Sequence, residues 1–399
     1  MDAPADRMER LDALAAEVIA QGLEGASLDS VLARDCDGLC ALGIPVLRVH
    51  VAMTAKHPEF GGDAHHWWRG KGATRERFAR IEGEPNEQWL TSPLYRLLNQ
   101  EKLTLRMALD DDTSRLYPLL DDLRRQGATD YFAAKVGFVP PPELSDGMMI
   151  SWTTDAEAGF SDDDLYCAQR LLPALSLAFK SQAKHQMAED LLSAYLGADA
   201  GWRVLSGSIT RGSVETVEAT ILYFDLQNFT RLSETVPGPD LIAMLNAYFG
   251  AVVPVIEAHG GNVLKFMGDG LLAIFAQDDT EAAGLAGIDA VLAIRAEMAE
   301  INRRRRADGL QTTDFNAALH AGEVLYGNIG APNRLDFTVI GPAVNTASRI
   351  LGMCDPVGQD IAISARVARP AMEKRPGLVS LGSYRLRGVR ERQELFTLD

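Results

Sequence analysis

Residues 262–275 read NVLKFMGDGLLAIF, two short apolar runs separated by a Gly-Asp-Gly turn at 268–270. Glycine tolerates the backbone angles that a tight turn requires, and each run has the length and apolar character of a strand. The pattern therefore predicts a hairpin, with one strand over 262–267 and the next over 271–275.

The segment before the hairpin predicts the sheet that the hairpin joins. Residues 217–224 form an apolar run typical of a buried strand that ends at Asp225, and residues 240–258 have helical periodicity. A strand, a crossover helix and a second strand of one sheet place the two strands parallel to each other. Asp225 and Asp269 should therefore lie at the same edge of the sheet.

Two carboxylates at one edge repel each other unless a cation lies between them. Hard divalent ions, Mg²⁺ first, bind carboxylate pairs together with substrate phosphates. Residues 226–230 lead into a helical turn whose free backbone N–H groups can hold a triphosphate. Taken singly, an Asp at a strand end is most often a turn or cap residue, and a Gly-Asp-Gly turn is common.

The remainder of the C-terminal half has a regular alternation of patterns. We expect a helix over 280–306, strands over 315–320, 324–329 and 335–340, a helix over about 343–353, and strands near Val379 and Glu394. The order β-α-β-β-α-β is that of a ferredoxin-like (split βαβ) sheet with additions, an α+β fold.

A polar pair lies on the helix expected after the last of these strands. Asn345 and Arg349 are four residues apart, so they project from one helical face and can reach one ligand. An amide that orients a sugar and a guanidinium that neutralises phosphate charge would suit that pair. The alternative is a surface helix with an incidental polar pair.

The N-terminal half mixes helices and strands. Residues 7–24 have helical spacing, and short strands are expected over 46–51, 131–136 and 148–153, which indicates a compact α+β domain. From Ser161 a helical pattern continues for about 35 residues to Gly197, a length that favours a connector between domains. In the alternative, Pro173 divides it into two core helices.

Four segments follow from these patterns. We predict a helical segment over 1–43, an α+β domain over 44–180, a helical linker and hinge over 181–215, and a second α+β domain over 216–399. The domain boundary is expected in the turn-rich part of the linker, residues 197–215.

Composition excludes several classes of protein. The chain has 399 residues, 39 Lys and Arg against 55 Asp and Glu, and a formal charge of −16, which argues against a nucleic-acid-binding protein. Its 4 cysteines are too sparse for a disulfide framework. Acidic residues break any signal-peptide pattern, and no run reaches about 18 uninterrupted apolar residues. We therefore expect a cytoplasmic protein without a membrane span.

Residues 224–230, 265–270 and 344–349, with Thr338, resemble the successive motifs of the class III nucleotidyl cyclase catalytic domain. The resemblance covers roughly residues 215–399 and implies two Mg²⁺ or Mn²⁺ ions per site. It implies metal contacts from Asp225, Asp269 and the backbone carbonyl of Leu226, purine contacts from Lys265 and Thr338, ribose orientation by Asn345, a transition-state role for Arg349, and phosphate contacts from Arg387, Phe229 and Thr230.

The purine-reading pair indicates the substrate. A Lys ammonium only donates and a Thr hydroxyl donates or accepts, which suits adenine. Guanylyl cyclases of this family typically carry Glu and Cys there, so the resemblance implies an adenylate cyclase of the class IIIb branch that converts ATP to cyclic AMP. A diguanylate cyclase would need a different hairpin. A guanylyl cyclase or an inactive nucleotide-binding scaffold remains the alternative.

The resemblance also implies partners. Family members combine the metal pair of one catalytic domain with the purine, ribose and arginine set of another, so we expect a homodimer through the catalytic domains and the linker helix. Residues 44–180 resemble a GAF-like sensory domain in outline, with an unknown small-molecule or protein effector.

Overall fold

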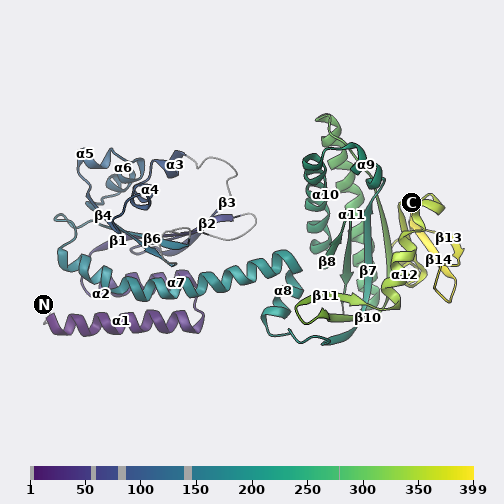
Figure 1. Ribbon diagram of the computed structural model, residues 1–399, viewed down its shortest axis with the longest axis horizontal. Coiled ribbons are helices and arrows are strands. Elements are labelled where there is room, and N and C mark those ends of the chain that lie inside the picture. The colour runs from purple at the N-terminus through teal and green to yellow at the C-terminus, as the bar shows by residue number, and fades with distance from the viewer. Residues whose placement is uncertain (1–3, 55–59, 80–86, 139–145, 278) are drawn as a thin grey trace. The chain divides into compact units, whose positions relative to one another are not determined.

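The computed structural model describes residues 4–54, 60–79, 87–138, 146–277 and 279–399 (Figure 1). The chain divides into two compact units, residues 1–191 and 192–399. The division falls earlier in the chain than the boundary that the sequence predicts within 197–215.

The first unit is an α+β domain built on one antiparallel sheet with the strand order β3-β2-β1-β6-β5-β4. Its elements are α1 (Pro4–Glu24), α2 (Leu28–Ala41), β1 (Val46–Thr54), β2 (Phe60–Trp68), β3 (Gly72–Ala79), α3 (Glu87–Leu90), α4 (Pro93–Leu98), β4 (Thr104–Ala108), α5 (Asp111–Ser114), α6 (Pro118–Arg125), β5 (Asp130–Gly137), β6 (Gly147–Thr154) and α7 (Asp162–Leu196). The predicted strands over 46–51, 131–136 and 148–153 correspond to β1, β5 and β6. The sequence patterns missed β2, β3 and β4, and β3 is mostly exposed, which leaves it without an apolar pattern.

Helices cover both faces of this sheet. Figure 1 shows α1, α2 and α7 on one side and the short helices α3 to α6 on the other. The larger core lies on the α7 side and includes Val49 of β1, Trp152 of β6 and Leu175 of α7. Successive strand residues point to opposite faces, so Arg48 and Ser151 lie on the side away from α7.

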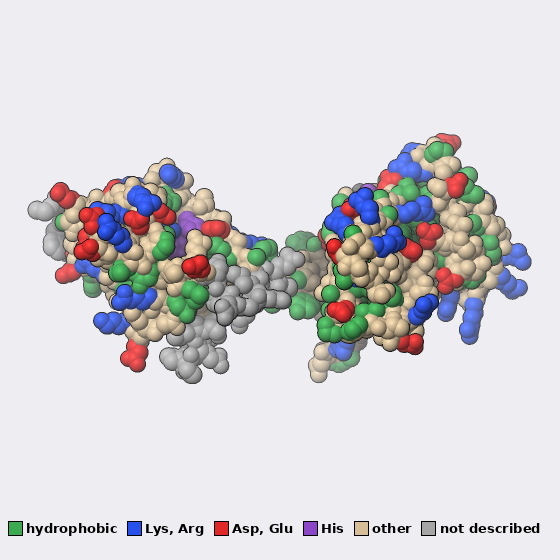
Figure 2. All heavy atoms as spheres, turned by 90° about the horizontal axis from the view of Figure 1, so that it is seen from above, with side chains coloured by type: hydrophobic (Ala, Val, Ile, Leu, Met, Phe, Trp, Pro, Cys, Tyr) green, Lys and Arg blue, Asp and Glu red, His purple; other side chains and the backbone are tan. Residues whose placement is uncertain are grey.

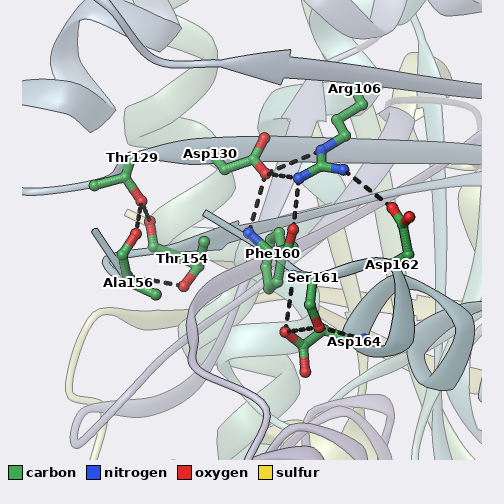
Figure 3. Close-up of polar contacts among 9 residues, drawn as sticks. All are labelled: Arg106, Thr129, Asp130, Thr154, Ala156, Phe160, Ser161, Asp162 and Asp164. Carbon is green, nitrogen blue, oxygen red and sulfur yellow. Dashed lines mark hydrogen bonds and ion pairs between the residues drawn. The ribbon is translucent and has the colours of Figure 1, made fainter. Parts of the chain in front are cut away.

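The helix α7 is continuous for 35 residues. The Ser161 hydroxyl accepts from the Asp164 backbone N–H, and the Asp164 carboxylate accepts from the Ser161 N–H in return, which is a capping box (Figure 3). Pro173 lies inside the helix without ending it. The alternative that Pro173 divides it into two helices is therefore wrong.

The second unit is also α+β. Its elements are α8 (Ala198–Leu205), β7 (Val214–Leu226), α9 (Phe229–Thr235), α10 (Gly238–Ala258), β8 (Asn262–Met267), β9 (Gly270–Phe275), α11 (Thr280–Ala307), β10 (Phe315–Ala331), β11 (Arg334–Ile340), α12 (Pro342–Leu351), α13 (Cys354–Val357), β12 (Ile361–Ser364), α14 (Ala365–Ala371), β13 (Leu378–Tyr384) and β14 (Gln393–Leu398). The sheet order is β13-β14-β12-β10-β7-β9-β8, with β11 paired to β10. Both β7 and β8 pair antiparallel with β9, so they run in the same direction, as the crossover argument predicts.

One predicted pair of strands is a single strand. The sequence predicts separate strands over 315–320 and 324–329, whereas β10 runs unbroken and pairs with β7 from Phe315 to Gly327. The small residues Ala321 and Gly322 weaken the apolar pattern, but the ladder to β7 continues through them and holds the strand together.

The predicted hinge over 197–215 also contains a helix. Within it, α8 buries Ala200 and Gly201, and its Asp199 accepts a hydrogen bond of 2.7 Å from the Tyr326 hydroxyl of β10. Glycines and polar residues make this segment look turn-rich in the sequence, but tertiary contacts order it as a helix.

Among the described residues, α10 is the one helix whose length and apolar composition would allow it to cross a bilayer. Its Met244, Tyr248, Val252 and Ile256 are fully buried in the core of the second unit, so the helix is part of that fold.

Figure 2 shows acidic and basic side chains interspersed over the visible face of each unit.

Candidate functional site

The hairpin turn lies beside the end of β7. Asp225 pairs with Gly270 across the β7–β9 ladder, and the Leu226 backbone N–H donates to the Asp269 carbonyl oxygen at 3.2 Å. The structure therefore brings Asp225, Leu226 and Asp269 to one edge of the sheet, as the strand order predicts.

Negative charge accumulates at this edge. Burial, the Asp269 carboxylate and the Asp355 carboxylate, in that order, raise the pKa of Asp225 to about 6. Over the described parts of the chain, neither Asp225 nor Asp269 forms an ion pair with a Lys, Arg or His side chain. Asp355 was not predicted from the sequence. It reaches this edge through Asn316, whose amide donates to it at 3.2 Å and which pairs with Asp225.

Two glycines shape the turn that carries Asp269. A Cβ on Gly270 would lie 2.8 Å from the Asp225 Oδ1 atom and 2.5 Å from the Phe224 carbonyl oxygen, so only glycine fits there. Gly268 has φ +72°, a conformation that other residues rarely adopt. Two carboxylates at one sheet edge with no counter-charge among the described residues fit a hard divalent ion with oxygen ligands.

The segment after the carboxylate leads into a short helix. Asn228 is the one described non-glycine residue with positive φ, at 55°, and α9 begins directly after it at Phe229. Phe229 packs against the core, whereas Thr230 is exposed. The first N–H groups of a helix have no partner within the helix, so those at the start of α9, which follows Asp225 in the chain, are available to a ligand.

The predicted purine-reading residues come from two strands. The Lys265 ammonium of β8 lies 3.2 Å from the Asp336 carboxylate of β11. Thr338 follows two residues later on the same face of β11 and is 5% exposed, and its hydroxyl has no hydrogen-bond partner among the described residues. Sequence reasoning missed Asp336, although an acid two residues before Thr338 in a strand is a readable signal.

The predicted ribose and arginine positions lie on α12. Asn345 and Arg349 are both exposed on the same helical face, while Thr346 and Ala347 between them are buried. Their side chains have no hydrogen-bond or ion-pair partner in the part of the chain that the structure describes, so both are free to meet a ligand.

Arg387 comes from a different segment, the connection between β13 and β14. It is exposed, directly after the buried Leu386. The roles of all these residues in binding or chemistry stay predictions.

The strand register separates two parts of this set. Thr338 pairs with Gly327, and Gly327 pairs with Val214, the first residue of β7. Asp225 is near the last residue of the same strand. Within one chain, Thr338 is therefore in register with the start of β7, whereas Asp225 lies near the end of β7.

A known family model matches most of the second unit. Residues 213–399 match the family model described as the adenylate and guanylate cyclase catalytic domain. An adenylate cyclase of Anabaena cylindrica is 33% identical over 162 residues, which is 41% of this chain and 32% of that protein. Adenylate cyclase 1 of Rhizobium meliloti (strain 1021) is 30% identical over 186 residues, 46% of this chain and 26% of that protein.

Among solved structures, an adenylyl cyclase from P. aeruginosa is 24% identical with a TM-score of 0.43, over 47% of this chain and 96% of that one. The chain spans about a third or less of the length of the adenylate cyclases of Anabaena cylindrica and Rhizobium meliloti.

Proposed function

We propose that this chain, whose residues 213–399 form a catalytic domain of the class III adenylate and guanylate cyclase family, converts ATP to 3′,5′-cyclic AMP and pyrophosphate. The observation that carries the proposal is the carboxylate pair Asp225 and Asp269, held together at one sheet edge without a counter-charge among the described residues. Its electrostatics favour a divalent metal and the phosphates that such a metal binds.

Asp225, Asp269 and the Leu226 backbone carbonyl would hold two Mg²⁺ or Mn²⁺ ions. When bound, such ions lower the pKa of the ribose 3′-hydroxyl and neutralise charge on the leaving pyrophosphate.

Lys265 and Thr338 are proposed to select adenine. The ammonium can donate to a ring nitrogen, and the Thr338 hydroxyl can accept from the exocyclic amine. The Thr338 hydroxyl is buried and has no partner among the described residues, which supports the proposal. A buried hydroxyl without a partner destabilises the protein, and a hydrogen bond to the ligand would remove that penalty.

Asn345 and Arg349 are proposed to act on the sugar and the α-phosphate. The amide would hold the ribose in line for attack, and the guanidinium would stabilise charge that develops at the α-phosphate. The N–H groups at Phe229 and Thr230, together with Arg387, would bind the remaining phosphate oxygens.

The active form is proposed to be a head-to-tail homodimer. Thr338 is in register with the start of β7, and Asp225 lies near its end. A complete site would therefore combine the Asp225 edge of one protomer with the Thr338 edge of its partner. A homodimer built this way has two equivalent sites. The N-terminal unit would regulate catalysis through α7.

The test is a product assay on the purified full chain. ATP and, separately, GTP are incubated with Mg²⁺ or Mn²⁺, and the cyclic products are resolved by chromatography. We expect cyclic AMP from ATP. Cyclic GMP as the main product would make the chain a guanylyl cyclase, and no cyclic product with either metal from a confirmed dimer would favour the inactive scaffold.

A further inference from the structure

A buried guanidinium in the N-terminal unit has no counter-charge. Arg48 of β1 is 6% exposed and lies on the sheet face away from α7. Its Nη2 atom lies 3.1 Å from the His66 Nδ1 atom, and its guanidinium lies 5.6 Å from the centre of the Trp68 ring. Its Nη1 atom has no hydrogen-bond partner, and no carboxylate of the described residues forms an ion pair with it.

Two further hydroxyl groups lie buried on the same face. Tyr131 of β5 is fully buried and Ser151 of β6 is 1% exposed; the two hydroxyls interact with each other, and neither has another hydrogen-bond partner among the described residues. Arg48 and Tyr131 are both opposite Thr153 of β6, and Ser151 is two residues from Thr153. The register thus gathers three buried donors on neighbouring strands.

The surroundings carry little other charge. Burial first, and then the Arg48 charge, lower the pKa of His50 and of His66, so both rings are neutral at neutral pH. Lys135, further along β5, donates to the backbone carbonyls of Leu98 and Gln100. The Glu76 carboxylate lies 3.4 Å from the His66 Nε2 atom and has 59% of its side chain exposed.

A structural role does not account for this arrangement. A buried charge without a partner destabilises a fold strongly, and buried donors without acceptors add to that cost. Native structures rarely keep several such groups together unless another molecule satisfies them. The missing component is a compact acceptor with one negative charge.

We propose that this face of the N-terminal sheet binds the carboxylate of a small organic acid. Its oxygens would accept from the Arg48 Nη1 atom and from the Tyr131 and Ser151 hydroxyls. A carboxylate balances the single charge of Arg48, whereas a phosphate dianion would leave one negative charge buried.

The position of the site connects it to the rest of the chain. Val49 and Trp152, the strand neighbours of Arg48 and Ser151, point to the opposite face and pack in the core that contains α7. A bound carboxylate would therefore stiffen the two strands on which α7 rests. This inference concerns the N-terminal unit and does not depend on the catalytic proposal.

The first test measures the melting temperature of the full chain without nucleotide. Sodium formate, acetate, propionate and benzoate are titrated at constant ionic strength, with sodium chloride and sodium phosphate as comparison salts. We expect at least one carboxylate to raise Tm by about 2–4 °C, and the Arg48→Met variant to lose this rise. No rise with any carboxylate, or an equal rise in Arg48→Met or with chloride, would overturn the proposal.

The second test uses the stability of the ligand-free chain. Removing an uncompensated buried charge should leave Tm equal to that of the wild type or higher, so Arg48→Met should not lower it. Arg106→Met is the matched control, because Arg106 donates to the buried Asp130 carboxylate at 2.8 and 3.0 Å (Figure 3) and its loss should lower Tm. A loss in Arg48→Met as large as in Arg106→Met would make Arg48 structural.

A milder pair of variants covers the case in which Arg48→Met does not fold. Tyr131→Phe removes a hydroxyl that interacts only with the Ser151 hydroxyl, so the ligand-free Tm should fall little, while the carboxylate-induced rise should shrink. Tyr248→Phe is the control, because the Tyr248 hydroxyl donates to the Asn302 side chain at 2.6 Å and accepts from the Thr313 N–H. A lower ligand-free Tm in both variants, with the carboxylate response intact in Tyr131→Phe, would contradict the site.

Discussion

The Lys265 ammonium lies 3.2 Å from the Asp336 carboxylate, and this ion pair connects β8 to β11 beside the buried Thr338 hydroxyl. The two residues are 71 positions apart in the sequence. The pair holds the flexible Lys265 side chain near the Thr338 hydroxyl, and the two groups are proposed to read adenine together. Part of the conformational entropy of Lys265 is therefore lost before the nucleotide binds.

Loss of this ion pair should weaken ATP binding more than turnover. For Asp336→Asn we expect KM for ATP to rise about 2- to 5-fold with kcat nearly unchanged, because a partly exposed pair contributes at most about 1 kcal/mol. Steady-state kinetics with ATP measure both constants. Glu281→Gln is the control, since it breaks the exposed Lys374–Glu281 pair elsewhere in the same unit and should leave KM unchanged. An unchanged KM in Asp336→Asn would mean that Asp336 does not position Lys265 for ATP binding.

The Thr338 hydroxyl should matter for substrate and not for folding. Thr338→Val keeps the shape and removes an unpartnered hydroxyl, so Tm should not fall, while kcat/KM for ATP should fall about 10-fold for one lost hydrogen bond. Thr220→Val is the matched control, because the Thr220 hydroxyl is also buried without a described partner but belongs to the middle of β7. Full ATP activity in Thr338→Val would remove Thr338 from the purine site.

Metal binding should depend on the protonation of Asp225. Its pKa is raised to about 6 from 3.8, so metal must displace a proton at low pH, and Mg²⁺ affinity should fall about 10-fold between pH 7 and pH 5. Calorimetric titration of the nucleotide-free chain measures this. Asp225→Asn should abolish the binding, whereas Asp308→Asn at the end of α11 should not change it. An affinity that does not vary with pH would mean that Asp225 is not a ligand.

The same shift predicts the pH dependence of stability without metal. The folded-state pKa lies above the unfolded one, so the contribution of Asp225 is present below about pH 4 and is lost as pH rises through 6. Because the group is only half-buried, we expect the loss to be about 1 kcal/mol of unfolding free energy. Urea unfolding at several pH values should show it in the wild type and not in Asp225→Asn. Equal pH profiles for the two proteins would contradict the assignment.

A site shared between protomers predicts complementation. Asp225→Asn and Arg349→Ala proteins should each be nearly inactive. After random mixing about half of the dimers are mixed, each with one intact site, so activity should return to about one quarter of wild type. Mixing Asp225→Asn with Asp269→Asn is the control, because both changes fall on the same half of the site. No recovery in the first mixture, with mixed dimers confirmed, would contradict a shared site.

Local sequence patterns determined much of the second unit. The Gly-Asp-Gly turn, the apolar runs around it and the helix before it lie within one stretch of about 60 residues. Strand direction follows from crossover handedness, so the meeting of Asp225 and Asp269 could be predicted. Apolar periodicity also indicated α7 as a single long helix, but it did not reveal exposed strands such as β3.

Tertiary structure alone decided the contacts between distant segments. The approach of Asp336 to Lys265, the effect of Asp355 on the pKa of Asp225, and the absence of a described counter-charge for Arg48 depend on strand register. The sequence determined which residue types were available and which elements would carry them. Register and burial decided which groups meet, because a shift of one residue along a strand would turn each of these side chains to the other face of its sheet.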